Sequence, residues 1–263
     1  MQRFSILALS ALLTCLPAFQ VQADADASAL TSAINQTGRQ RMLSQRIAKS
    51  YAAIGLQVDA VAARAQLFEA AREFDRNLDV LKALQIPTPA IQGAITELER
   101  VWLPFRETAL GPVEQSGAQR LLEQDAKVLG AAEQVVRLYQ DYAGISLGRL
   151  VNLAGRQRML TQRMAKLYML KAWGMETPEL SEGIHRAREE FEQGFWELEM
   201  APQNSYEINR ELEAAVTQWN WFTSAIEQEG DPRAYLLVVN DAAESLLASM
   251  DFLTSLYEAE AHR

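Results

Sequence analysis

The sequence contains few of the residues from which catalytic and metal sites are usually built. Its 263 residues include one cysteine, Cys15, and two histidines, His185 and His262. Thiolate zinc sites, disulfides and Ser–His or Cys–His catalytic pairs therefore have almost no residues available. Glu182 precedes His185 by three residues, but no second Glu-x-x-His pair exists to complete the di-iron site of some helical bundles. We expect no enzymatic activity, no metal and no cofactor.

Long apolar runs are also lacking, apart from a short one at the N-terminus. Residues 4–16 are apolar and follow Arg3, but they are too few to span a bilayer, which takes about 20 residues. A small-x-small pattern ends at Ala23. These features predict a signal peptide over residues 1–23, cleaved after Ala23, and a soluble periplasmic protein. The alternative, a lipoprotein signal at Cys15, fits its flanking residues poorly.

Positive charge is in the minority, but it is concentrated locally. The chain has 25 basic and 34 acidic residues and a net charge of −9, which argues against nucleic acid as a partner. Arg39, Arg41, Arg46 and Lys49 nevertheless lie within one short segment. A local cluster of this kind could still bind a small anion.

That basic segment occurs twice. Residues 34–49 recur as residues 151–166 at an offset of 117, with 11 of 16 positions identical. Their shared pattern is Asn-x-x-Gly-Arg-Gln-Arg-Met-Leu-Ser/Thr-Gln-Arg-x-Ala-Lys. The offset persists at Glu73-Phe74 and Glu190-Phe191, and becomes 118 at Leu138-Tyr139 and Leu256-Tyr257. We therefore predict two equal modules, over residues 27–143 and 144–263.

Each module is predicted to contain four helices. In the first module the apolar spacing and the turn residues place them at about 27–58, 60–84, 90–110 and 116–142. In the second module the breaks fall at 177–178, 201–202 and 230–232. The expected fold is all-α, with two tandem up-down-up-down four-helix bundles. Helical spacing also predicts that all five tryptophans lie in the core.

The connection between the modules allows two arrangements. Tyr139 to Gly155 contains Gly144 and Gly148 but no proline. The fourth helix could continue into the fifth, which would stack the bundles end to end. A kink at the glycines would instead fold the bundles side by side. We expect the end-to-end arrangement.

The repeated segment predicts a helix with two different faces. Advancing about 100° per residue places Gln45 and Lys49 within about 20° of Gly38. Arg41 flanks this polar face on one side, and the aliphatic residues lie opposite. The polar face could be solvated or salt-bridged to neighbouring helices, as helix charges usually are. It could instead form an anion pocket, because guanidinium groups bind planar anions through two parallel hydrogen bonds.

This motif resembles the PilJ-type sensor domain, the N-terminal ligand-binding region of type IV pilus chemotaxis transducers. The periplasmic domains of nitrate/nitrite sensor kinases of the NarX and NarQ type are similar. The resemblance implies a four-helix bundle whose first helix binds nitrate where two such helices meet across a dimer. It also implies that Arg41 and Arg158 are the chief anion-binding residues. The two could pair within one chain or each with its counterpart in a homodimer.

The candidate ligand-binding residues follow from the motif and from the helix face. They are Asn35, Gly38, Arg41, Gln45 and Arg46 in the first copy, and Asn152, Gly155, Arg158, Gln162 and Arg163 in the second. The sequence carries no kinase or other signalling region, so a membrane-bound sensor or transducer is the expected partner. We therefore expect a periplasmic sensor of a small anion such as nitrate or nitrite. The alternative is an interaction module whose Gly-Arg face docks a membrane receptor or pilus-related partner without a small ligand.

Overall fold

The computed structural model describes residues 16–84, 88–144, 146–175, 177–228 and 230–260. Within these ranges it is helical, and it has no strand. The elements are α1 (Leu16–Gly55), α2 (Ala60–Ala83), α3 (Pro89–Leu110), α4 (Gln115–Ala143), α5 (Ser146–Ala172), α6 (Pro178–Glu199), α7 (Tyr206–Ile226), the short 3₁₀ helix η1 (Pro232–Tyr235) and α8 (Leu236–Glu260). The predicted all-α fold of two four-helix modules is confirmed.

Capping residues begin two of the helices. Thr88 caps α3, and its side chain accepts a hydrogen bond from the Ile91 amide just before Pro89 takes the first helical position. Asp59 caps α2 in the same way through the Ala62 amide. The first helix ends at Gly55, earlier than the predicted residue 58, because Gln57 and Asp59 adopt positive φ angles.

The N-terminal prediction falls largely outside the described residues. Residues 1–15, which contain Cys15 and most of the predicted signal peptide, are not described. The helix α1 begins at Leu16, ahead of the predicted start near Ala27. Among the described residues, no helix has the length and apolar character needed to cross a membrane.

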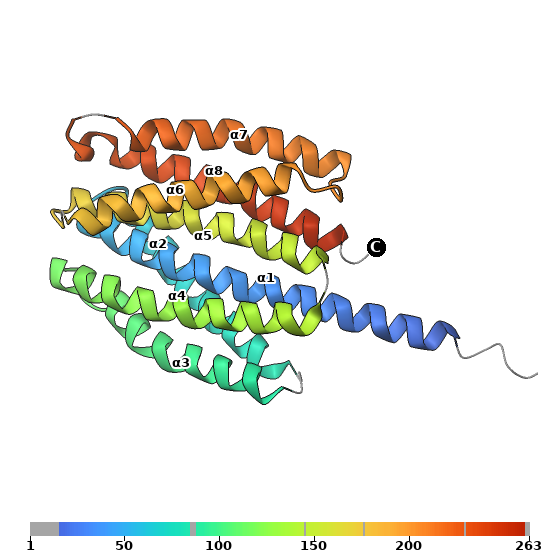
Figure 1. Cartoon of the computed structure of the whole chain (residues 1–263). Helices are drawn as coiled ribbons and strands as arrows, with labels where there is room; N and C mark the ends of the chain where they lie inside the picture. The colour runs from blue at the N-terminus through green and yellow to red at the C-terminus, as the bar shows by residue number, and fades with distance from the viewer. Residues whose placement is uncertain (1–15, 85–87, 145, 176, 229, 261–263) are drawn as a thin grey trace, which may run out of the picture.

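The two modules lie side by side, so the expected end-to-end stacking is wrong. Helix α4 ends at Ala143. The next residue, Gly144, has a φ of 60°, and this left-handed conformation terminates the helix. The chain then turns back, and α5 runs beside α1 in the same direction (Figure 1). The α1–α5 contact is the most extensive contact between any two of the described helices. The repeated motifs are thereby brought face to face.

The buried apolar residues of both modules form one continuous cluster, which includes the aliphatic sides of α1 and α5. Leu43, Ile47 and Tyr51 of α1 are fully buried, as the aliphatic side of the predicted helix requires. Trp102 is 1% exposed and stacks on Phe74 with ring centroids 3.7 Å apart. Trp173 and Trp219 are partly buried against the core, but the core prediction is wrong for the other two tryptophans, because helical spacing does not show which face of a helix is covered by a neighbour. Two tryptophans, Trp196 and Trp221, are 59% and 43% exposed.

Candidate functional site

The two repeated segments meet along the α1–α5 interface, with their glycines at the same level. A Cβ added to Gly38 would lie 3.3 Å from Nη2 of Arg41 and 3.7 Å from Nη2 of Arg158. A Cβ added to Gly155 would lie 3.2 Å from Nη2 of Arg158 and 3.8 Å from Nη2 of Arg41. The missing side chains therefore give both guanidinium groups room to lie against the interface.

The two arginines exchange contacts across the interface in a reciprocal way. Arg41 of α1 donates from Nη2 to Oδ1 of Asn152 at 2.5 Å, and Arg158 of α5 donates from Nη2 to Oδ1 of Asn35 at 2.7 Å. Each asparagine also reaches the last helix of the opposite module. The amide of Asn35 donates to Glu258 at 2.6 Å, and that of Asn152 donates to Gln140 at 2.8 Å. The contacts follow an approximate twofold symmetry between the modules.

Acidic residues of the fourth and eighth helices complete the arrangement. Arg41 pairs with Glu133 of α4 at 2.6 Å, and Arg158 pairs with Asp251 of α8 at 2.6 Å. Both carboxylates also bind an arginine of the opposite module: Glu133 binds Arg156 at 3.3 Å, and Asp251 binds Arg39 at 3.0 Å.

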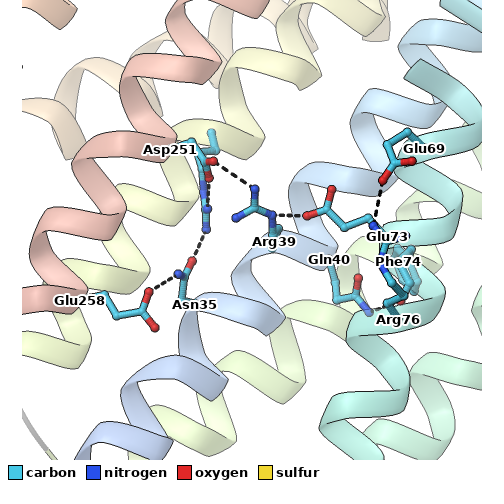
Figure 2. Close-up of polar contacts among 10 residues, drawn as sticks. Asn35, Arg39, Gln40, Glu69, Glu73, Phe74, Arg76, Asp251 and Glu258 are labelled. Atoms are coloured by element: carbon cyan, nitrogen blue, oxygen red, sulfur yellow. Dashed lines mark hydrogen bonds and ion pairs between the residues drawn. The ribbon is translucent and has the colours of Figure 1, made fainter. Parts of the chain in front are cut away.

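Figure 2 shows one half of this network. Arg39 lies between Asp251 and Glu73, and Asn35 lies beside Glu258. In the other half, Arg156 likewise joins Glu133 to Glu190. The network thus connects α1 and α2 of the first module to α8 of the second, and α5 and α6 of the second module to α4 of the first.

The central arginines are unusually well shielded from water. Both residues are 0% exposed, although arginine is among the residue types least often buried. Burial lowers the pKa of each guanidinium, and Arg41 lowers the pKa of Arg158 further by like-charge repulsion. In both residues Nε is buried without a hydrogen-bond partner. Buried donors usually have partners, so these two require an explanation.

A second layer of buried charge lies about two helical turns further along α1 and α5. Lys166 binds Asp125 of α4 at 2.6 Å and Oε1 of Gln45 at 2.7 Å. Gln45 in turn donates to Asp125 at 2.7 Å. On the other side, Lys49 pairs with Glu244 of α8. Each lysine is therefore held by a carboxylate from the opposite module.

The structure brings six of the ten sequence-predicted candidates together at one place. They are Asn35, Gly38, Arg41, Asn152, Gly155 and Arg158. Gln45 belongs to the lysine layer, and Gln162 donates to the Ala243 carbonyl at 3.3 Å. Arg46 lies on an outer flank, paired with Glu244, and Arg163 lines a groove between α4 and α6. Arg46 and Arg163 therefore lie apart from the central pair.

Sequence reasoning missed the acidic partners, although the repeat contained a signal for them. Glu133 and Asp251 are separated by the same offset of 118 that relates Tyr139 to Tyr257. Glu73 and Glu190 follow the offset of 117. An acidic residue retained at equivalent positions of two otherwise diverged copies indicates a partner for a retained arginine. Among the described residues, no group of three or more His, Cys, Asp or Glu side chains could hold a metal ion.

Acid should weaken the fold through these carboxylates. Burial opposes the ionisation of Glu133 and Asp251, but their arginine partners outweigh it and hold both pKa values below the ordinary 4.5 and 3.8. A lowered folded-state pKa contributes stability above the unfolded value, and this contribution is lost as pH falls through the folded value. We expect the free energy of unfolding to fall as the pH drops below about 4.5, measured by urea titration at several pH values.

A matched variant tests the origin of that acid dependence. The double variant Glu133→Gln/Asp251→Asn should lose part of the acid-dependent stability and should have a flatter profile than the native chain. An unchanged slope in this variant would mean that other carboxylates are responsible.

Comparison with known proteins identifies this arrangement at the level of the family. The sequence matches the family described as type IV pili methyl-accepting chemotaxis transducer N-term (PilJ), over residues 23–134 and again over residues 146–242. The search found no match among curated proteins or solved structures. The matched family consists of non-catalytic sensing domains, and no enzyme family is indicated. The chain therefore belongs to the PilJ family of chemotaxis-transducer N-terminal sensing domains, of which it carries two tandem copies.

Proposed function

We propose that this chain is a periplasmic sensing protein that binds one small planar anion, of the nitrate or nitrite type, between Arg41 and Arg158. The observation that carries the proposal is the pair of fully buried guanidinium groups beside Gly38 and Gly155, each with an unpartnered Nε. Two like charges held together away from water favour an anion between them. A planar oxyanion can accept two parallel hydrogen bonds from each guanidinium.

The asparagines supply a way for such binding to be reported. Their Oδ1 atoms accept hydrogen bonds from the Nη2 atoms that an anion would also use. An anion competing for these donors would loosen Asn35 and Asn152, which also reach Glu258 of α8 and Gln140 of α4. Ligand binding would thereby alter the contacts between modules. In this proposal a membrane-bound sensor or transducer detects the change in module packing.

A second candidate is an interaction module without a small ligand. Its support is that Glu133 and Asp251 already pair with Arg41 and Arg158, each within the same module. The charge of the central arginines is therefore balanced inside the chain. In this case the arginine network would serve to hold the two modules together, and the signal would come from a docked partner.

Isothermal titration calorimetry with nitrate and nitrite separates the two candidates. The native chain should bind one of these anions saturably, and Arg41→Lys/Arg158→Lys should weaken binding by roughly tenfold or more because lysine keeps the charge but loses the two-pronged donor. Arg100→Lys is the matched control, since Arg100 is exposed and pairs with nearby Glu97, far from the central arginines in sequence. Binding by neither anion to a folded native chain would contradict the anion proposal and favour the interaction module.

A further inference from the structure

The approximate symmetry between the modules is broken at two adjacent positions of α4 and α8, because Asp125-Ala126 of the first module is equivalent to Ala243-Glu244 of the second. This break leaves an arginine without a partner. Arg46 of α1 and Arg163 of α5 are equivalent in the repeat, as are Lys49 and Lys166. Arg46 and Lys49 share the carboxylate of Glu244. At an offset of 118, the residue equivalent to Glu244 is Ala126. Arg163 therefore has no equivalent carboxylate in its half of the molecule.

The place that this carboxylate would occupy is an open groove. A cavity of about 480 Å³ lies between α4 and α6, with α5 as its floor, and both Ala126 and Arg163 line it. Gly130 of α4, where an added Cβ would meet no atom within 4 Å, leaves part of this space unfilled, whereas Gly183 of α6 packs closely on Leu167. A volume of this size is within the range of small-molecule pockets, which is about 300–1,000 Å³.

The other basic side chains in the groove are already paired with carboxylates, and Glu179, which also lines the groove, is hydrogen-bonded to Thr177. Lys166 is held by Asp125, Arg156 by Glu133 and Glu190, and Arg186 by Glu182 at 3.5 Å. Among the described residues that line the groove, Arg163 is the basic side chain for which no ion pair or hydrogen bond is recorded. It is half-buried, so its charge is only partly solvated. An anion entering the groove would find this guanidinium available.

The remaining lining is mostly apolar and indicates what kind of anion fits. Leu129 of α4, Met159 and Leu167 of α5, and Leu180 of α6 contribute to the walls and floor. A small inorganic anion would leave these surfaces in contact with water. A ligand with a carboxylate at one end and an apolar body would both pair with Arg163 and bury its body on them.

We propose that this groove is a second ligand site, which binds a small organic monocarboxylate with an apolar body. The carboxylate pairs with Arg163 as the Glu244 side chain pairs with Arg46 in the other half of the molecule. The site is separate from the central pair Arg41 and Arg158 and does not depend on anion binding there. Glu244 thus serves both Lys49 and Arg46 in one half, whereas in the other half Asp125 serves Lys166 and the ligand supplies the carboxylate for Arg163.

The test uses benzoate and hexanoate as probes, measured by isothermal titration calorimetry on the full chain. The native chain should bind at least one of them, whereas hexanol, which has no charge, should not bind measurably. Arg163→Gln should weaken binding by roughly tenfold or more, because the charge-assisted contact is lost. Nitrate binding at the central arginines should be unchanged in this variant, so the two proposals can fail independently.

A second variant supplies the missing carboxylate from inside the chain. Ala126→Glu, at an exposed position of α4, should pair with Arg163 and abolish binding of both probes while keeping the thermal stability of the native chain. Ala90→Glu, on α3 outside the groove, is the control with the same added charge. The proposal is overturned if the native chain binds neither probe, or if both Arg163→Gln and Ala126→Glu bind them as the native chain does.

Discussion

Replacing Asp125 by alanine should lower the free energy of unfolding by about 3–5 kcal/mol, because it leaves a buried lysine without its counter-charge. Lys166 is 2% exposed and Asp125 is 4% exposed, and their charged atoms are 2.6 Å apart. Burial lowers the pKa of Lys166, and Asp125 opposes that shift. Without Asp125, the amide oxygen of Gln45 is the contact that remains for the ammonium group.

Two comparisons separate the loss of the counter-charge from the loss of packing. The double variant Asp125→Ala/Lys166→Met should recover much of the lost stability, because removing both charges of a buried pair is often neutral. Glu97→Ala removes an exposed carboxylate that pairs with Arg100 and should lower the free energy of unfolding far less, because water solvates both charges. Urea titrations followed by circular dichroism give all three values. An Asp125→Ala cost no larger than that of Glu97→Ala would mean that water reaches Lys166.

Replacing Trp102 by alanine should also destabilise the chain by about 3–5 kcal/mol, the usual range for removing a large buried aromatic residue. Trp102 is 1% exposed, and its ring stacks on Phe74 and contacts Phe105. Its indole nitrogen donates to Asp75 at 2.8 Å, so the variant loses a hydrogen bond as well as packing. The expected result is a lower midpoint in thermal and urea unfolding of the chain.

The repeat supplies a matched control for Trp102. Trp219 is the equivalent residue of the second module, and it stacks on Phe191 with centroids 4.0 Å apart but is only partly buried. Trp219→Ala should therefore lower the free energy of unfolding by less than Trp102→Ala does. Trp196 is 59% exposed, so Trp196→Ala should change the free energy of unfolding by no more than about 0.5 kcal/mol. If all three substitutions lowered the free energy of unfolding equally, the differences in burial would not explain the stability of these sites.

The helices and the candidate residues were predictable because their signals are local. Turn residues mark the breaks between helices, and apolar spacing marks the buried face, so α2, α3 and α4 agree with prediction to within a residue at each end. The Gly-Arg motif was identified by its repetition alone. The sequence also placed Arg41 and Arg158 on the face opposite the aliphatic residues, which is where the structure places them.

The direction in which the modules pack was not predictable from the same signals. Residues from Tyr139 to Gly155 are compatible with a continuous helix or with a reversal, because glycine is tolerated in both. The chain reverses at Gly144 because the reversal buries the α1–α5 interface. That interface contains the paired arginines, asparagines and lysines. Those contacts join residues more than a hundred positions apart.

The sequence by itself determined the helical class, the two copies, the family and the basic motif, because each depends on residues close together along the chain. Only the tertiary structure decided that Arg41 faces Arg158, that Glu133 and Asp251 balance them, and that Arg163 has no carboxylate of its own. These are properties of helices brought together from opposite modules. The distances and burial that set their energies exist only after the chain has folded.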